Sequence, residues 1–250
     1  MLIRNEQMQA LSLVPEEAFQ LQLVEEMRQF APWHAQILGD SGLLRCVEFA
    51  KRRAASYGFT NRGPIRLYLQ MIFLLGADFD SDPLLPWAAA ALSTPSTADQ
   101  TARATSLYRA LDHYIQHVAG PANSFAKQAL ARAHVELSTS PGDDEKFSDE
   151  IIFDTLRRVY PEKCDYAGES AVRQSIQLGK AAAERHSTNG QGVVLFCGLI
   201  FALGHGFETD PHLPWIGKTL NEPGLTGSRL VQRLSSRVKT YLDQVIANVG

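Results

Sequence analysis

One segment of the chain occurs twice, and this repeat constrains the fold more than any other feature. Residues 70–87 read QMIFLLGADFDSDPLLPW and residues 198–215 read GLIFALGHGFETDPHLPW. The second segment follows the first by 128 residues, with conservative changes of aspartate to glutamate and serine to threonine. We expect a structural or partner-binding role for the repeated motif, whose positions are Gly76, Phe79, Asp80, Asp82, Pro83, Pro86, Trp87, Gly204, Phe207, Glu208, Asp210, Pro211, Pro214 and Trp215.

The repeat continues on both sides of the motif with small changes in offset. Pro32 corresponds to Pro161 at an offset of 129, and Tyr114 corresponds to Tyr241 at an offset of 127. A period of this length is too long for a solenoid of short repeats, which fall at roughly 20–50 residues. The chain is therefore predicted to contain two tandem homologous helical bundles that arose by internal duplication.

The expected boundaries follow from turn-forming residues between the two copies. Gly120-Pro121 ends the first copy, and the polar segment 138–144 (STSPGDD) reads as a linker. The predicted organisation is a first helical repeat over 1–118, a connecting helix and linker over 119–146, and a second helical repeat over 147–250.

Hydrophobic periodicity predicts helices throughout. Apolar residues recur at helical spacing in 19–30, 43–54, 104–118, 151–159 and 230–245, and no alternating strand pattern stands out. Asp82 and Asp210 are expected to cap helices that begin at Pro83 and Pro211, because the first helical position does not need an N–H. We expect an all-α protein of about ten or eleven helices.

Composition excludes several classes of function. The formal net charge of −3 gives no electrostatic footprint for DNA or RNA. The longest apolar stretch, 193–203, is shorter than the roughly 20 residues that cross a bilayer, and the N-terminus lacks the apolar run of a signal peptide. Three widely separated cysteines without a CxxC pair read as reduced core thiols. We therefore expect a cytoplasmic protein that binds no nucleic acid and does not insert into membranes.

Two groups of residues have spacings that also occur in metal sites. Asp78, Asp80 and Asp82 have the D-x-D-x-D spacing of a calcium loop, but the required glycine and bidentate glutamate are missing, so turn solvation and capping explain them better. His113 and His117 lie four residues apart without an HExxH pattern and read as ordinary surface histidines. No metal or cofactor is expected.

Catalytic signatures are absent from the sequence. No GxSxG, GxGxxG or P-loop pattern occurs, and His205 and His212 form at best a weak candidate for a catalytic pair. Phe79 and Trp87, with their counterparts Phe207 and Trp215, could line an aromatic ligand slot, although aromatic residues at a tight turn are more often part of the core. The sequence predicts no catalytic residue, and the protein is expected not to be an enzyme.

Three segments of the chain resemble one protein family. They are Ala54 to Thr60 (AASYGFT), Leu67 to Gly76 (LYLQMIFLLG) and Asp78 to Trp87 (DFDSDPLLPW). Together with the opening IRNEQM they resemble the small helical accessory proteins encoded beside spike genes in bacterial type VI secretion clusters. The likeness covers residues 1–118 and, in degenerate form, 147–220.

The resemblance implies an auxiliary role and supplies no catalytic residues. It suggests a non-enzymatic adaptor or co-chaperone that binds a type VI secretion effector, its chaperone or the spike protein and assists loading. The alternative is an immunity protein that neutralises a cognate effector toxin. A groove between the bundles, or the N-terminal arm Met1 to Val14 bounded by Pro15, is the expected partner contact.

Overall fold

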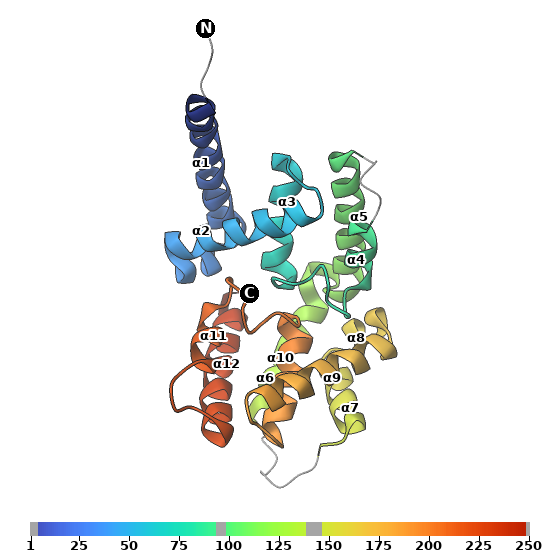
Figure 1. Ribbon diagram of the computed structural model, residues 1–250. Coiled ribbons are helices and arrows are strands. Elements are labelled where there is room, and N and C mark those ends of the chain that lie inside the picture. The colour runs from blue at the N-terminus through green and yellow to red at the C-terminus, as the bar shows by residue number, and fades with distance from the viewer. Residues whose placement is uncertain (1–4, 94–98, 139–146, 249–250) are drawn as a thin grey trace.

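The structure is a computed structural model that describes residues 5–93, 99–138 and 147–248, with side chains from residue 15 onward. Over these residues it is entirely helical, with twelve α-helices, one short 3-10 helix and no strand (Figure 1). The all-α prediction is confirmed. The helices are α1 Asn5–Phe30, α2 Pro32–Ser56, α3 Arg62–Leu75, α4 Pro86–Leu92, α5 Gln100–Val118, η1 Pro121–Asn123, α6 Ser124–Ser138, α7 Asp149–Val159, α8 Pro161–Ala167, α9 Glu169–Arg185, α10 Gln191–Leu203, α11 Pro214–Leu220 and α12 Gly227–Asn248.

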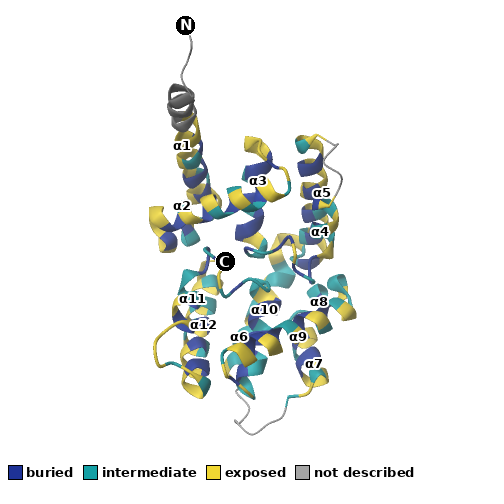
Figure 2. Ribbon diagram, in the orientation of Figure 1, coloured by how far each residue is buried: buried dark blue, intermediate teal, exposed yellow. Residues whose placement is uncertain are grey.

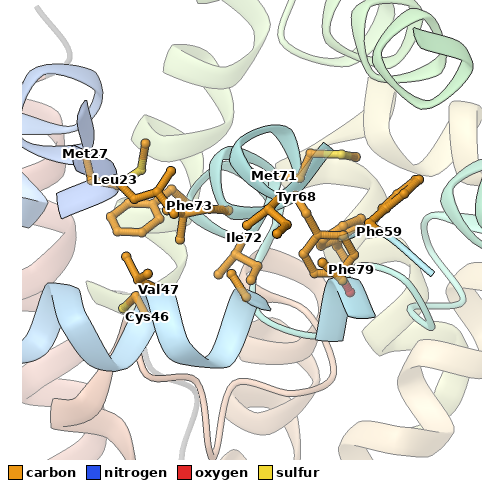
Figure 3. Close-up of a cluster of buried hydrophobic side chains, with 14 of the residues drawn as sticks. Leu23, Met27, Cys46, Val47, Phe59, Tyr68, Met71, Ile72, Phe73 and Phe79 are labelled. Carbon is orange, nitrogen blue, oxygen red and sulfur yellow. The ribbon is translucent and has the colours of Figure 1, made fainter. Parts of the chain in front are cut away.

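Helices α1–α5 share one hydrophobic core, centred on α3. Because α3 is apolar on most of its surface, it can be covered from several sides at once. Figure 3 shows side chains from α1, α2, α3 and the following turn meeting in this core. The fully buried members with the largest side chains include Leu23, Met27, Phe59, Tyr68, Leu69, Met71, Ile72 and Phe79.

Helices α6–α12 form the other half of the molecule, around the apolar helix α10. Two adjoining clusters of buried side chains lie here, one between α9, α10, α11 and α12 and one between α7, α8, α9 and α10. Helix α6, expected as a connector, packs on α12 and α7 of this half. The predicted linker at 138–144 lies almost wholly outside the described residues.

The halves use the same pairs of helices. Helix α3 packs on α2 and α5 in the first half, as α10 packs on α9 and α12 in the second. Likewise α4 packs on α5 and α11 packs on α12. In Figure 1 the blue-to-green half lies above the yellow-to-red half, and Figure 2 shows the buried residues along their inward faces.

One helix boundary differs from expectation, and two glycines mark sharp turns of the chain. Pro15 lies inside α1, so it does not end an arm at Val14. A proline leaves one carbonyl of the preceding turn unpaired but does not always end a helix. In addition, Gly39 interrupts α2 with φ 60°, and Gly168 separates α8 from α9 with φ 84°. Glycine adopts positive φ easily, so these two residues let the backbone turn sharply at corresponding points of the two halves.

Within the described part of the chain, no helix is both long and apolar enough to cross a membrane.

Candidate functional site

The two copies of the motif follow the same backbone path. Gly76 ends α3 with φ 98° and ψ 163°, and Gly204 ends α10 with φ 90° and ψ 161°. After the turn, Leu85 and Leu213 precede the next helices with φ and ψ of −124° and 50°, and of −122° and 53°. Residues 70–92 and 198–220 therefore form the same helix–turn–helix unit.

The predicted role of the motif aspartates as helix caps is wrong. Helices α4 and α11 begin three residues later than expected, at Pro86 and Pro214, and neither has a side-chain cap. Instead, the Oδ1 atom of Asp82 accepts a hydrogen bond of 2.8 Å from the backbone N–H of Leu84. Asp210 accepts the equivalent bond, also 2.8 Å, from the N–H of His212. The aspartates thus fix a tight turn before each helix.

The second oxygen of each aspartate reaches the opposite half of the chain. Asp82 Oδ2 accepts the backbone N–H of His205 at 3.2 Å, and Asp210 Oδ2 accepts the N–H of Ala77 at 3.0 Å. Ala77 and His205 are themselves 128 positions apart. The two motifs therefore meet face to face and are joined by a reciprocal pair of hydrogen bonds. We call this contact the seam.

The motif glycines allow the backbones to approach closely at the seam. A Cβ on Gly76 would lie 2.4 Å from the carbonyl oxygen of Leu203, which is nearer than atoms can come. A Cβ on Gly204 would lie 3.2 Å from Asp82 Oδ2. These positions need glycine both for positive φ and for space.

One difference between the motifs also has a steric reason. The first motif has Asp78 where the second has Gly206, and the two residues touch across the seam. A Cβ on Gly206 would lie 2.0 Å from Asp78 Oδ2. Two aspartates would thus compete for one space and bring like charges together, so only one half carries the carboxylate.

The acidic side chains next to the seam are paired within their own halves. Asp80 is 2% exposed, accepts the phenol of Tyr68 at 2.5 Å and forms an ion pair with Arg53. Its counterpart Glu208 accepts Arg185 at 2.6 Å and His186 at 2.7 Å. Because these carboxylates are paired, their roles are structural: Asp80 ties its turn to α2 and α3, and Glu208 ties its turn to the end of α9.

Burial shifts the pKa values of the seam groups. Burial raises the pKa of Asp210 to about 6, although two backbone N–H groups oppose the shift. Asp82 raises the pKa of His205, whose Nδ1 lies 3.8 Å from the carboxylate. Burial raises the pKa of Tyr68. Shifts of this kind also occur in structural networks, so they do not by themselves indicate catalysis.

The motif aromatics belong to the cores. Phe79 and Phe207 are fully buried. Trp87 and Trp215 are half-buried, and each packs on a tyrosine of the final helix of its half: the Trp87–Tyr114 ring centroids are 5.5 Å apart and those of Trp215–Tyr241 are 5.6 Å apart.

A cavity of about 230 Å³ opens beside the second motif, where α2 faces α11 and α12. The sequence pointed to Trp215 as a candidate slot residue but not to the residues of α2 and α12 that complete the cavity, because α2 lies far from α11 and α12 in the chain. Its lining residues are His34, Ile37, His212, Leu213, Trp215, Arg237, Thr240, Tyr241 and Gln244.

The histidines that the sequence singled out do not come together in one site. His113 and His117 stack with ring centroids 4.1 Å apart, and His113 contacts Tyr166. His205 and His212 have different neighbours, since His205 lies by Asp82 whereas His212 packs between His34 and Phe73. In the ranges with described side chains, no three histidine, cysteine or acidic residues are grouped to hold a metal ion.

The three cysteines are free and buried, as expected of core thiols. Burial raises the pKa of Cys46 and Cys197 to about 12 and that of Cys164 to about 11. A thiol with a raised pKa is a poor nucleophile at neutral pH.

Comparison with protein-family models, curated proteins and solved structures finds no match for this chain.

Proposed function

We propose that this protein is a non-enzymatic adaptor or co-chaperone of a bacterial type VI secretion system, which binds an effector, its chaperone or the spike protein and assists loading. It would act in the cytoplasm through protein contacts. The resemblance of residues 54–60, 67–76 and 78–87 to accessory proteins of such clusters motivates the proposal.

The observation that supports a non-enzymatic role is that the acidic side chains of the motif are engaged in contacts within the protein. Asp82 and Asp210 bind backbone N–H groups across the seam, and Asp80 and Glu208 pair with neighbouring cations. Groups engaged in this way hold a scaffold together. A scaffold of two joined bundles offers its outer helix faces to a protein partner.

We further propose that the halves arose by duplication of one unit, with repeats over 1–118 and 147–250 joined by 119–146. The shared helix pairs, the shared turn and the reciprocal seam support this history. Because α6 packs on α12 and α7, the connecting segment completes the second bundle.

The experiment is affinity capture of the tagged full-length protein, co-expressed with the products of its neighbouring genes. Recovery of an effector, effector chaperone or spike protein, together with lower effector export in a deletion strain, is the expected result. Failure to recover any of them would reject the adaptor role.

A toxicity assay distinguishes the adaptor from the alternative, an immunity protein. An adaptor leaves the growth of cells that express the effector unchanged, whereas an immunity protein restores their growth.

Truncation of residues 1–12, followed by the same affinity capture, tests the N-terminal arm. The truncation removes the first turns of α1, which begins at Asn5, and should weaken recovery of the partner if the arm binds it.

A further inference from the structure

The cavity beside the second motif has a filled counterpart beside the first. Tyr166 of α8 follows Ile37 of α2 by 129 positions, the offset that relates Pro32 to Pro161. The Tyr166 ring lies 5.3 Å from that of Tyr114, at 88°, and its phenol is 2.9 Å from Nδ1 of His113. A phenol ring from α8 thus occupies this corner, where α8 packs directly on α5.

The open corner keeps the same aromatic wall, and Trp33 packs on Tyr241 there with ring centroids 5.6 Å apart, but no phenol stands at position 37. The Trp215–Tyr241 ring pair has an interplanar angle of 37°, close to the 35° of Trp87–Tyr114. Ile37 of the first half stands at the position of Tyr166 in the second half, and it is 52% exposed. The cavity is therefore the space that a phenol fills on the other side of the molecule.

Two buried polar atoms in the open corner lack partners in the described part of the chain, whereas the Tyr241 phenol and His34 Nε2 lie 3.1 Å apart and are bonded to each other. His212 is 7% exposed, and its buried Nε2 has no hydrogen-bond partner among the described residues. The buried Nε1 of Trp215 has none either, as is also true of Trp87 Nε1 beside the filled corner, so His212 is what distinguishes the open corner. An unpaired buried polar atom costs free energy.

The cavity has one formal charge. Arg237, which replaces Ala110 of the first half, donates to Thr219 Oγ1 at 2.6 Å and makes no ion pair within the described residues. No aspartate or glutamate lines the cavity. The lining is thus complementary to an aromatic group that carries, or lies next to, an anion.

We propose that this cavity receives one aromatic side chain of the protein partner, the size of a phenol, while a carboxylate of the same partner segment pairs with Arg237. The assignment rests on the proposed adaptor function. It names the chemistry of the partner: an aromatic residue next to an acidic one.

The first test uses two small probes on the full-length protein. We expect 4-hydroxyphenylacetate to bind more tightly than 4-ethylphenol, as measured by saturation-transfer NMR and by displacement titration. Ile37→Tyr should fill the cavity as Tyr166 fills its counterpart, and should weaken both probes at least about tenfold. Ile151→Tyr is the matched control, because Ile151 is also exposed and lies on α7 away from the cavity.

The charge is tested on its own. Arg237→Ala should weaken 4-hydroxyphenylacetate about tenfold and leave 4-ethylphenol unchanged, whereas Lys239→Ala, which removes an exposed cation outside the cavity on the same helix, should change neither. Equal binding of the probes to wild type and Ile37→Tyr would overturn the site.

The second test uses whichever neighbouring gene product the wild-type protein captures. We expect Ile37→Tyr to lose that product and Ile151→Tyr to retain it. If Ile37→Tyr retains the partner at full strength, the adaptor function stands but the cavity is not its docking site. If wild type captures no product, the adaptor function fails while the probe titrations still report on the cavity.

Discussion

Asp82 and Asp210 each accept a backbone N–H from the half of the chain to which the other belongs, at 3.2 Å and 3.0 Å. Both are 3% exposed, and each also holds its own turn through its other oxygen. One side chain thus connects a local turn to the contact between halves. Each motif thus supplies one acceptor and one N–H donor to that contact.

Removal of either carboxylate should destabilise the whole protein. Asp82→Ala and Asp210→Ala each leave two N–H groups without an acceptor, and we expect a loss of about 1–3 kcal/mol per unsatisfied buried group. Chemical denaturation followed by circular dichroism measures it. Asp165→Ala, which removes an exposed partner of Arg157, is the control and should stay within about 0.5 kcal/mol. Wild-type stability in both seam variants would contradict this role.

The contact between Asp78 and Gly206 predicts a rescue. Gly206→Asp places two carboxylates in one space, so we expect a loss of about 1–3 kcal/mol from overpacking, with like-charge repulsion in addition. The double variant Asp78→Gly/Gly206→Asp moves the aspartate to the other half and should recover most of the loss. Thermal melts of the two proteins suffice. If the double variant is as unstable as the single one, the residues do not share that space.

The two motif tryptophans should differ in how much they stabilise the fold. Trp87→Ala removes a ring from the first core and should cost about 3–5 kcal/mol. Trp215→Ala should cost less, because one side of Trp215 already faces the cavity and so has fewer contacts to lose. Equilibrium unfolding gives both values. Equal or reversed losses would mean that the cavity is closed in solution.

The buried His212 predicts a dependence of stability on pH. Burial, with a smaller contribution from His34, lowers its pKa from 6.5 to about 3, so below pH 6.5 the unfolded chain takes up a proton that the folded chain does not. Its contribution to stability is therefore present above pH 6.5 and is lost as the pH falls towards 3. His212→Leu removes the effect, and leucine stands at the corresponding position 84.

The comparison isolates His212 from other groups that titrate nearby. Between pH 4 and 6, Asp210, with a pKa of about 6, stabilises the fold as the pH falls, whereas His34, with a pKa of about 4, destabilises it as His212 does. Asp210 and His34 are present in the wild type and in the variant alike. We expect the free energy of unfolding of His212→Leu relative to wild type to rise between pH 7 and pH 5. A difference that does not change with pH would show that folding leaves the pKa of His212 unchanged.

Much of the fold could be predicted from the sequence. The motif at 70–87 and 198–215 indicated a shared helix–turn–helix, because its glycines and prolines fix the backbone locally. Helix periodicity located most of the remaining helices. The start of α4 was misplaced because Pro83 and Pro86 are both acceptable first residues, and the side-chain bond of Asp82 to Leu84 selects the later one.

The site was harder to predict because it depends on contacts between distant segments. Nothing local to Asp82 indicates that its second oxygen meets the N–H of His205, 123 positions away. The cavity likewise combines residues from α2 and α12. Apart from Trp215, the one sequence signal for the cavity is that the first half has Ile37 at the position where the second half has Tyr166. That difference indicates a cavity only once the packing of Tyr166 is known.

Amide hydrogen exchange at Ala77 and His205 tests most directly whether the two motifs join the halves. Both amides should be protected in the wild-type protein. Asp210→Ala should release Ala77 while His205 stays protected, and Asp82→Ala should release His205 while Ala77 stays protected. This crossed pattern is expected only if each carboxylate binds the opposite half. Fast exchange of both amides in the wild-type protein would contradict the seam.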